Sequence, residues 1–252
     1  MKSLTSLTNP TVKKIQSLHS SKGRKEYRQF IGEGLRICAT LIDSPIKLDQ
    51  LYTTAAMEDQ AKELAPEHKL TLVSNVVMEK ISGSTTPSGL LGVFAIPDNN
   101  PKAQLKAGIA LAQIADPGNM GTLIRSAVAM GAGSIVIIEG ADVWSPKVVQ
   151  SSAGAIAYAP IYSMSWKELV ANKKNLILSA LVVDGGVAPE TLNDGNKRIV
   201  VVGNEANGIP HDWLQDCEEQ VTLAMPGGTE SLNAAIAGSI AMYLILGKKK
   251  VS

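Results

Sequence analysis

Apolar residues in the second part of the chain form short continuous runs separated by segments of helical character. The runs are rich in Val, Ile and Leu and predict strands at residues 108–115, 134–138, 176–183, 198–203 and 220–224. Between or after them the sequence predicts helices at 119–131, 146–153, 166–173, 209–215 and 231–246. Continuous apolar strands separated by helices are typical of a parallel sheet covered on both faces, which indicates the α/β class.

The first part of the chain also alternates between helices and strands, and it is long enough for a smaller α/β domain. Its pattern predicts helices at 11–20, 33–42 and 75–81 and strands at 47–53, 69–73 and 90–96. Pro97 and Pro101 bracket three turn-forming residues, which indicates a linker. We therefore expect domains at 1–97 and 108–252, joined by a linker at 98–107.

Composition excludes several classes of protein. The 252 residues are 45% hydrophobic and 19% charged, as in a globular chain rather than a disordered one. Cys38 and Cys217 lie far apart, so we expect no disulfide framework and a reducing, cytoplasmic location. The three histidines show no ligand spacing, so no metal site is expected. The apolar run at 232–246 is shorter than the roughly 20 residues that span a bilayer, and it predicts a buried helix rather than a membrane segment.

The formal net charge of +1 conceals an asymmetry. The first 28 residues hold seven basic side chains and one acidic one, a local charge of +6, and the rest of the chain carries −5. Lys248–Lys250 add positive charge at the other end. A basic arm on a mildly acidic body favours binding to an anion such as RNA. The arm is also Ser- and Thr-rich like a mitochondrial transit peptide, although its lysines favour a retained functional segment.

Three segments in the second part bear candidate chemistry. In the first, a strand ends at Asp116, Pro117-Gly118 turns the chain, and Asn119 is a candidate helix cap. Arg125 lies outside the apolar stripe of that helix, so it points away from the core. A capped helix with a solvated arginine is the simpler interpretation of this segment.

The second segment follows a buried strand, whose carboxyl end is where open parallel sheets usually bind ligands. Gly203 and Gly208 permit tight turns there, and Glu205 is the carboxylate at the tip. The third segment leads through a glycine pair into the apolar helix predicted from Ser231 onward, in which Asn233 needs a polar partner. An ordinary polar loop and a structural helix cap are the simpler interpretations. Gly131-Ala-Gly133 ends a helix and lacks a third glycine, so it is not a dinucleotide fingerprint.

Together, in this order and spacing, the segments resemble the three motifs of the SPOUT superfamily of methyltransferases, in its SpoU/TrmH branch. Further similar segments are Asn9-Pro10, Glu33-Gly34-x-Arg36, Thr86–Gly89 and Ser145–Ala155. The chain departs from the family pattern at Gln150, Asn207 and Pro226. The resemblance implies a trefoil-knotted, mostly parallel sheet domain preceded by a smaller α/β RNA-binding domain with a ribosomal-protein-like fold. It also implies a homodimer formed through the knotted domain, with the helix at 231–246 as part of the contact.

The resemblance also implies S-adenosylmethionine as the cofactor and a set of site residues. The implied catalytic residues are Asn119, Arg125, Glu205, Ser231 and Asn233. The implied cofactor contacts are Val183, Gly203, Asn204, Leu223, Met225, Ser231 and Leu232. The implied RNA contacts are Lys13, Lys14, Arg24, Arg28, Glu33 and Arg36.

We expect methyl transfer to a ribose 2′-hydroxyl of RNA, most simply ribosomal RNA of the 23S type. Arg125 is assigned to a phosphate of the target nucleotide, because its planar fork binds two oxygens. A role of this arginine as general base stays open, but a guanidinium holds its proton strongly and Glu205 is chemically the better acceptor. Alternatives are a tRNA substrate, a non-catalytic RNA-binding or ribosome-assembly protein, and a nucleotide-dependent enzyme of small molecules, which the absent glycine fingerprint disfavours.

Overall fold

The computed structural model describes residues 1–98, 104–193, 195–227 and 231–247. Contacts divide the chain into two compact units, one of Met1–Asp98 with Asp142–Tyr158 and one of Asn99–Ala141 with Ala159–Ser252. The expected division differs at one segment, because it assigned 142–158 to the second domain. Part of the expected linker, 99–103, and the basic Lys248–Lys250 lie outside the described residues.

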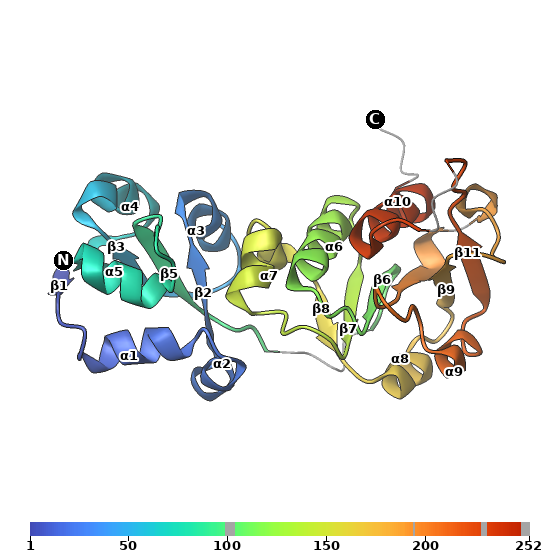
Figure 1. The fold of residues 1–252 in the computed structure, drawn as a ribbon, viewed down its shortest axis with the longest axis horizontal. Coiled ribbons are helices and arrows are strands. Elements are labelled where there is room, and N and C mark those ends of the chain that lie inside the picture. The colour runs from blue at the N-terminus through green and yellow to red at the C-terminus, as the bar shows by residue number, and fades with distance from the viewer. Residues whose placement is uncertain (99–103, 194, 228–230, 248–252) are drawn as a thin grey trace. The chain divides into compact units, whose positions relative to one another are not determined.

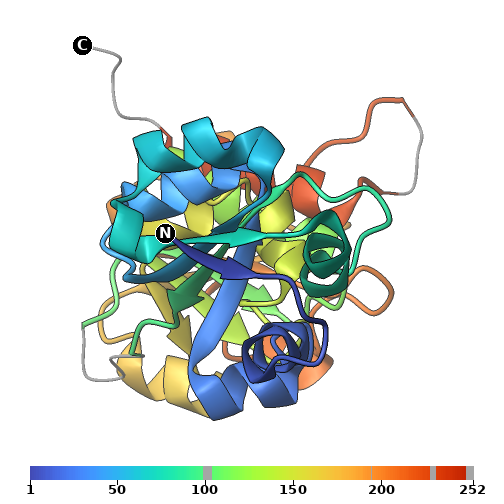
Figure 2. The same ribbon diagram turned by 90° about the vertical axis from the view of Figure 1, so that its left-hand side faces the viewer.

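The first unit contains a mixed five-stranded sheet. Its order is β1 (Lys2–Leu4), β4 (Leu70–Val73), β3 (Leu48–Thr53), β5 (Leu90–Ala95) and β2 (Gln29–Glu33). β4 pairs in parallel with β1 and β3, whereas β5 pairs antiparallel with β3 and β2. Helices α1 (Pro10–Ser17) and α5 (Asn75–Ser82) cover one face, and α3 (Leu35–Ile42) and α4 (Glu58–Leu64) cover the other (Figure 2). Short 3-10 helices η1 (Ala55–Met57) and η2 (Glu67–Lys69) complete the connections.

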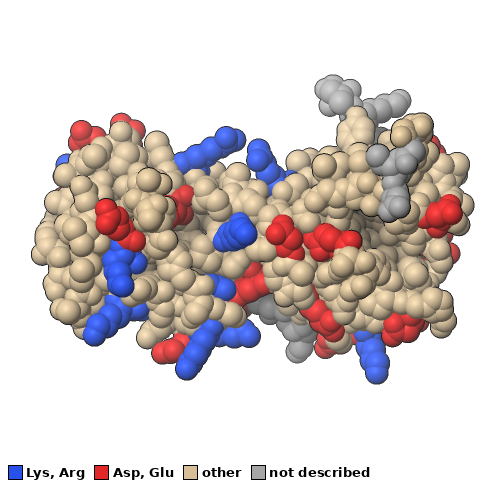
Figure 3. Space-filling view, in the orientation of Figure 1, with Lys and Arg blue, Asp and Glu red and all other residues tan. Residues whose placement is uncertain are grey.

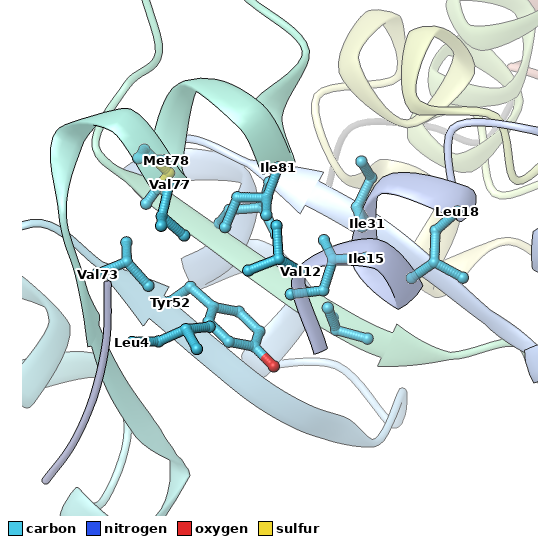
Figure 4. Packing of buried hydrophobic residues seen from close by; sticks show 12 residues of the cluster. Leu4, Val12, Ile15, Leu18, Ile31, Tyr52, Val73, Val77, Met78 and Ile81 are labelled. Atoms are coloured by element: carbon cyan, nitrogen blue, oxygen red, sulfur yellow. The ribbon is translucent and has the colours of Figure 1, made fainter. Parts of the chain in front are cut away.

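The basic residues 1–28 are part of this unit, as the expected domain at 1–97 implied. Val12, Ile15 and Leu18 lie on one face of α1 and are buried in a cluster with side chains of α5 (Figure 4). Helix α2 (Ser21–Tyr27) follows, and its Gly23 lies against the carbonyl of Ser17 too closely for any side chain. Because the burial of apolar side chains stabilises the fold, α1 is a structural element despite its lysines.

The segment 142–158 packs against the first unit through buried contacts. The guanidinium of Arg24 binds the carboxylate of Asp142, with the closest nitrogen and oxygen 2.7 Å apart. The Trp144 ring lies with its centroid 4.8 Å from that of Phe30. Helix α7 (Pro146–Ser151) and 3-10 helix η3 (Ala155–Tyr158) complete the segment. The family resemblance had not placed this segment with the RNA-binding domain.

The second unit is built on a six-stranded sheet in which every strand pair is parallel. The order is β11 (Glu219–Thr222), β9 (Ile177–Val182), β10 (Arg198–Val202), β6 (Gly108–Ala112), β7 (Ser134–Ile138) and β8 (Ile161–Ser163). Helices α6 (Pro117–Ala129) and α10 (Ala234–Leu246) lie on one side, and α8 (Trp166–Asn172) and α9 (His211–Leu214) lie on the other (Figure 1). The predicted α/β class with a mostly parallel sheet is confirmed.

The connection from β9 to β10 reaches both β11 and α10. It includes 3-10 helices η4 (Pro189–Thr191) and η5 (Gly195–Lys197). Val187 pairs with Val221 at the edge of β11, and Gly195 lies too close to the carbonyl oxygen of Ile245 to accommodate a side chain. These contacts place α10 against the connection between β9 and β10. The trefoil knot itself stays a prediction. Among the described residues, no helix combines the length and the apolar character needed to cross a membrane.

Candidate active site

A cavity of the second unit lies where β9, β10 and β11 end, as expected for a parallel sheet. Its volume is about 680 Å3, and its lining includes residues 203–208 and apolar residues such as Leu223 and Leu232. All seven residues expected to contact a cofactor line it: Val183, Gly203, Asn204, Leu223, Met225, Ser231 and Leu232. The structure thus brings together residues from three separate segments, in a space of the size that binds small molecules.

The loop after β10 is held in shape by its own hydrogen bonds. The Oδ1 atom of Asn204 accepts from the backbone N–H groups of Ala206 and Asn207, at 2.8 and 3.3 Å. The backbones of Asn204 and Gly208 exchange two hydrogen bonds of 3.0 and 2.9 Å. Any side chain at Gly203 would collide with the backbone of Gly208 and Ile209. A glycine is therefore required at this point of the cavity wall.

Gln113 supports this loop through a hydrogen bond, a role that the sequence pattern did not reveal. Its backbone carbonyl accepts a 2.9 Å hydrogen bond from Nδ2 of Asn204. Gln113 has φ +58°, and Glu139, to which its side chain donates at 2.7 Å, has φ +59°. Left-handed backbone is unfavourable for residues other than glycine and often occurs at functional sites. No spacing of residue types in the sequence could have predicted these two backbone conformations.

Three of the expected catalytic residues form a hydrogen-bonded chain at the rim of the cavity. The Oδ1 atom of Asn233 accepts from the N–H groups of Ala235 and Ile236, at 2.9 and 3.3 Å. Its Nδ2 atom donates to Oδ1 of Asn119 at 3.0 Å. The Nδ2 atom of Asn119 then donates to Oε1 of Glu205 at 2.7 Å. Because the helix N–H groups require an oxygen of Asn233, both amides are oriented and the chain ends on the carboxylate.

The helix caps differ from the expected ones in a way that frees Asn119. The N-cap of α6 is Asp116, whose Oδ1 accepts from the Asn119 N–H at 2.8 Å, so the expected cap at Asn119 was wrong. Helix α10 begins at Ala234 with Asn233 as its N-cap, later than the expected start at Ser231. Since Asp116 occupies the capping position, the side chain of Asn119 is available for Glu205.

Arg125 and Ser231 belong to the same expected catalytic set as these three residues. They take no part in the hydrogen bonds that join Asn233, Asn119 and Glu205. Arg125 is exposed on α6, as its position outside the apolar stripe predicted, and it has no ion pair or hydrogen-bond partner among the described residues. Ser231 is exposed and lines the cavity. The arginine fork is therefore free to bind an external anion.

The expected RNA contacts in the first unit have different surroundings. Lys13 and Arg36 are exposed, and Arg28 is exposed with a 2.7 Å ion pair to Asp98. Lys14 is half-buried, with its ammonium 5.1 Å from the centroid of the Tyr27 ring. On the face drawn in Figure 3, basic side chains gather over α1 and α2.

Arg24 was wrongly expected to contact RNA. It is only 3% exposed and is occupied by Asp142 and by the carbonyl of Leu18, because a buried guanidinium needs a full set of acceptors. Glu33 accepts hydrogen bonds from Oγ of Ser82, at 2.8 Å to the nearer oxygen, and from the N–H of Ser88 at 3.1 Å. These bonds join two family-like segments, and an RNA contact by Glu33 stays a prediction.

A metal centre has no obvious place in the described part of the chain, which contains no cluster of three or more His, Cys, Asp or Glu side chains. Burial raises the pKa of the Cys38 thiol to about 12, and burial together with neighbouring Glu218 does the same for Cys217. Neither thiol is therefore an activated nucleophile at neutral pH.

Family models and known proteins agree with this geometry. A model described as the SpoU rRNA Methylase family matches residues 106–243, and one described as the MRM3-like substrate binding domain matches residues 9–92. The mitochondrial rRNA methyltransferase 3 of Homo sapiens is 32% identical over 93% of this chain and 72% of its own. The 23S rRNA (guanosine(2553)-2'-O)-methyltransferase RlmP of Bacillus subtilis is 24% identical over 98% of this chain and 100% of its own.

A solved structure extends the similarity to three dimensions. The AdoMet-bound rRNA methyltransferase from Sinorhizobium meliloti superimposes with a TM-score of 0.85 at 28% identity, over 97% of both chains. The first family model covers more than half of this chain, including all three segments of the site. The chain therefore belongs to the SpoU rRNA methylase family.

Proposed function

We propose that this protein transfers a methyl group from S-adenosylmethionine to a ribose 2′-hydroxyl of ribosomal RNA, of the 23S type. The observation that carries the proposal is the oriented chain from Asn233 through Asn119 to Glu205, at the rim of a cavity walled by backbone. The names of the relatives support the substrate class, since RlmP is named as a 23S rRNA 2′-O-methyltransferase.

The cavity suits S-adenosylmethionine by its chemistry. Backbone groups of the 203–208 loop can bind the edge of an adenine, and Leu223 and Leu232 can cover its ring. Leu223 is 8% exposed and Leu232 is 37% exposed. Leu223 is therefore held by its neighbours, whereas the side chain of Leu232 can move to cover the ring. When bound, the cofactor supplies a methyl group already activated by its sulfonium.

The protein side chains position the hydroxyl and receive its proton. Glu205 is the proton acceptor, and the hydrogen bond from Asn119 to Oε1 orients the carboxylate so that Oε2 is available. Arg125 binds a phosphate of the target nucleotide through its planar fork, which fixes the ribose for in-line attack. Ser231 lies at the cavity lining and holds the ribose or the loop in place.

The first unit binds the RNA, with Lys13 and Arg36 as exposed cations and Arg28 available once its ion pair with Asp98 exchanges. An exposed pair of this kind contributes little energy, so exchange costs little. The match of this unit to a substrate-binding model supports its role. An RNA substrate of this class, together with the free thiols, supports a cytoplasmic location.

We also propose that the active protein is a homodimer in which the two copies pair through α10. This helix exposes an apolar stripe of Ile236, Ile240 and Tyr243, which are 52%, 40% and 63% exposed. The spacing places the three side chains on one side of the helix. An exposed apolar stripe on an otherwise apolar helix is typical of a protein interface.

Methyl transfer with tritiated S-adenosylmethionine tests the proposal. Label should appear in 23S ribosomal RNA, and mapping should place it on a ribose 2′-oxygen. Label in transfer RNA alone would move the substrate to the alternative class. RNA binding without uptake of S-adenosylmethionine would instead identify a non-catalytic RNA-binding or ribosome-assembly protein.

A further inference from the structure

A second cavity lies wholly within the first unit and shares no residue with the active-site cavity. Its volume is about 430 Å3, and it opens between β1, the start of α1 and the neighbouring strands β3 and β4. The polar residues of its lining include Lys2, Asn9, Lys14, Asp49, Gln50 and Tyr52. A cavity with several polar groups converging on it is a candidate ligand site.

Tyr52 is the buried polar group that faces this cavity. Its side chain is only 6% exposed, and its ring packs among the apolar residues of the α1 and α5 cluster. Figure 4 shows the hydroxyl pointing away from the cluster, and the residue lines the cavity. The hydroxyl has no hydrogen-bond partner among the described residues and is not one of their fully buried unpartnered atoms, so it can donate to a ligand in the cavity. Burial, aided by the charge of Asp49, raises the pKa of Tyr52 to about 12, so the hydroxyl is a donor at neutral pH.

The lining of the cavity contains cations. Lys2 lies beside Thr71 in the sheet, and Lys14 lies on α1, whose first turn contains no acidic residue. Asn9 caps this helix by accepting from the Thr11 N–H at 2.8 Å, which leaves its amide nitrogen as a donor. A helix N-terminus beside ammonium groups attracts anions.

Acceptor atoms also line the cavity. Gln50 donates from Nε2 to Oγ1 of Thr71 at 3.0 Å, which directs its carbonyl oxygen elsewhere. Asp49 accepts from Gln29 at 3.0 Å with Oδ2, so Oδ1 is the freer oxygen. A ligand that fits this lining carries both an anionic group and hydrogen-bond donors. A nucleotide has this arrangement, with its phosphate at one end and the exocyclic amine or ribose hydroxyls at the other.

We propose that this cavity binds one nucleotide of the RNA strand, with its phosphate at Lys14 and Lys2 and its base or ribose at Tyr52. The inference rests on the proposed function, because that function makes RNA the polymer that the first unit meets. The site is a separate anchor for the strand, in addition to the contacts of the nucleotide that is methylated.

The experiment measures binding of a fluorescent single-stranded RNA to the full-length protein at several salt concentrations. Tyr52→Phe keeps the ring in the core and removes only the hydroxyl, so it should weaken binding about five-fold without changing the salt dependence. Lys14→Gln should reduce the slope of log affinity against log salt by about 0.7, the value for one phosphate contact of a single strand. Lys80→Gln is the matched control, since this exposed lysine of the same unit neither lines the cavity nor belongs to the expected RNA contacts.

The outcomes distinguish failure of the proposed nucleotide site from failure of the proposed function. Equal effects of Lys80→Gln and Lys14→Gln, with no effect of Tyr52→Phe, would overturn the subsite and leave diffuse attraction of RNA. Competition by free nucleoside monophosphates without any effect of Tyr52→Phe on RNA binding would assign the cavity to a small ligand instead. A wild-type protein that binds S-adenosylmethionine but no RNA would contradict the proposed function itself.

Discussion

The side-chain nitrogen of Asn119 donates a 2.7 Å hydrogen bond to Oε1 of Glu205, which connects the start of α6 to the loop after β10. Asn119 is itself oriented by Asn233, and Asn233 by the first N–H groups of α10. The carboxylate is therefore positioned by a helix end through two amides. Each amide can be altered without removing the carboxylate, which makes the relationship testable.

Asn233→Asp should separate stability from activity. Aspartate is as good an N-cap as asparagine, so α10 stays capped and the melting temperature should change little. The amide donor toward Asn119 is lost, and the second oxygen repels Oδ1 of Asn119. We expect methyl transfer to fall by about ten-fold or more, because a reoriented Asn119 no longer donates to the charged Glu205 and a hydrogen bond to a charge is lost.

Asn233→Ala is the control for that variant. It removes both the cap and the donor, so it should lose activity and also about 1 kcal/mol of unfolding free energy. Equal activity of Asn233→Asp and the wild-type protein, measured with tritiated S-adenosylmethionine, would show that the chain of amides has no part in the reaction.

Arg125→Ala should leave cofactor binding nearly unchanged and abolish methylation of RNA. The side chain is exposed and has no described partner, so its removal costs little stability. Calorimetry with S-adenosylmethionine measures the first effect and a methyl-transfer assay the second. Arg125→Lys should recover only part of the activity, because an ammonium cannot bind two phosphate oxygens in one plane. Retained activity in Arg125→Ala would exclude the assigned role.

Gly203→Ala should block uptake of S-adenosylmethionine. The added methyl group collides with the backbone of Gly208 and Ile209, so the cavity wall must move. Gly227→Ala is the matched control, since a side chain there meets no atom within 4 Å. Thermal unfolding identifies any general loss of fold, and normal binding by a folded Gly203→Ala protein would place the cofactor elsewhere.

Ile240→Glu should convert the proposed dimer to monomers. The side chain is 40% exposed, so a charge is tolerated in a free chain but not in an apolar contact. Tyr158→Glu is the control, as an aromatic residue with 48% exposure in the first unit. Light scattering measures the mass of both variants. A wild-type monomer, or an unaffected dimer in Ile240→Glu, would contradict pairing through α10.

Arg24→Gln should destabilise the first unit, with little change expected from Lys25→Gln at the exposed neighbouring position. Breaking the pair with Asp142 should lower the free energy of unfolding by about 2 kcal/mol at neutral pH. Although burial raises the pKa of Asp142, its hydrogen bond and ion pair with Arg24 outweigh that effect and lower the pKa below 3.8. The contribution of the pair is therefore present above this pH and is lost as the pH falls through the lowered value. Denaturant unfolding of the wild-type protein and Arg24→Gln should converge in acid; a constant difference would exclude this pair as the cause.

The regular elements were largely predictable because their apolar patterns are strong. The strand at 134–138 and the helix at 75–81 agree with β7 and α5 to within one residue. The short strands β1 and β8 and the polar helices α2 and α4 were not predicted, since their stability comes from neighbours distant in the sequence. The cavity residues could be anticipated from three motifs, although their roles remain proposals.

Other features of the site required the backbone. The burial of Arg24 was not predictable, because its partner Asp142 lies 118 positions away along the chain. The left-handed conformation of Gln113 and the direction of the amide chain depend on how strands and helices meet, which residue spacing does not encode.

The grouping of residues 142–158 with Met1–Asp98 has a consequence for protein engineering. A fragment that stops near residue 98 would lack Asp142 and Trp144 and would leave the Arg24 guanidinium and one side of Phe30 without their partners. The substrate-binding half cannot be exchanged between relatives as one contiguous cassette. A functional chimera must transplant two separate pieces of the gene together, and libraries built by simple front-half replacement should yield mostly insoluble protein.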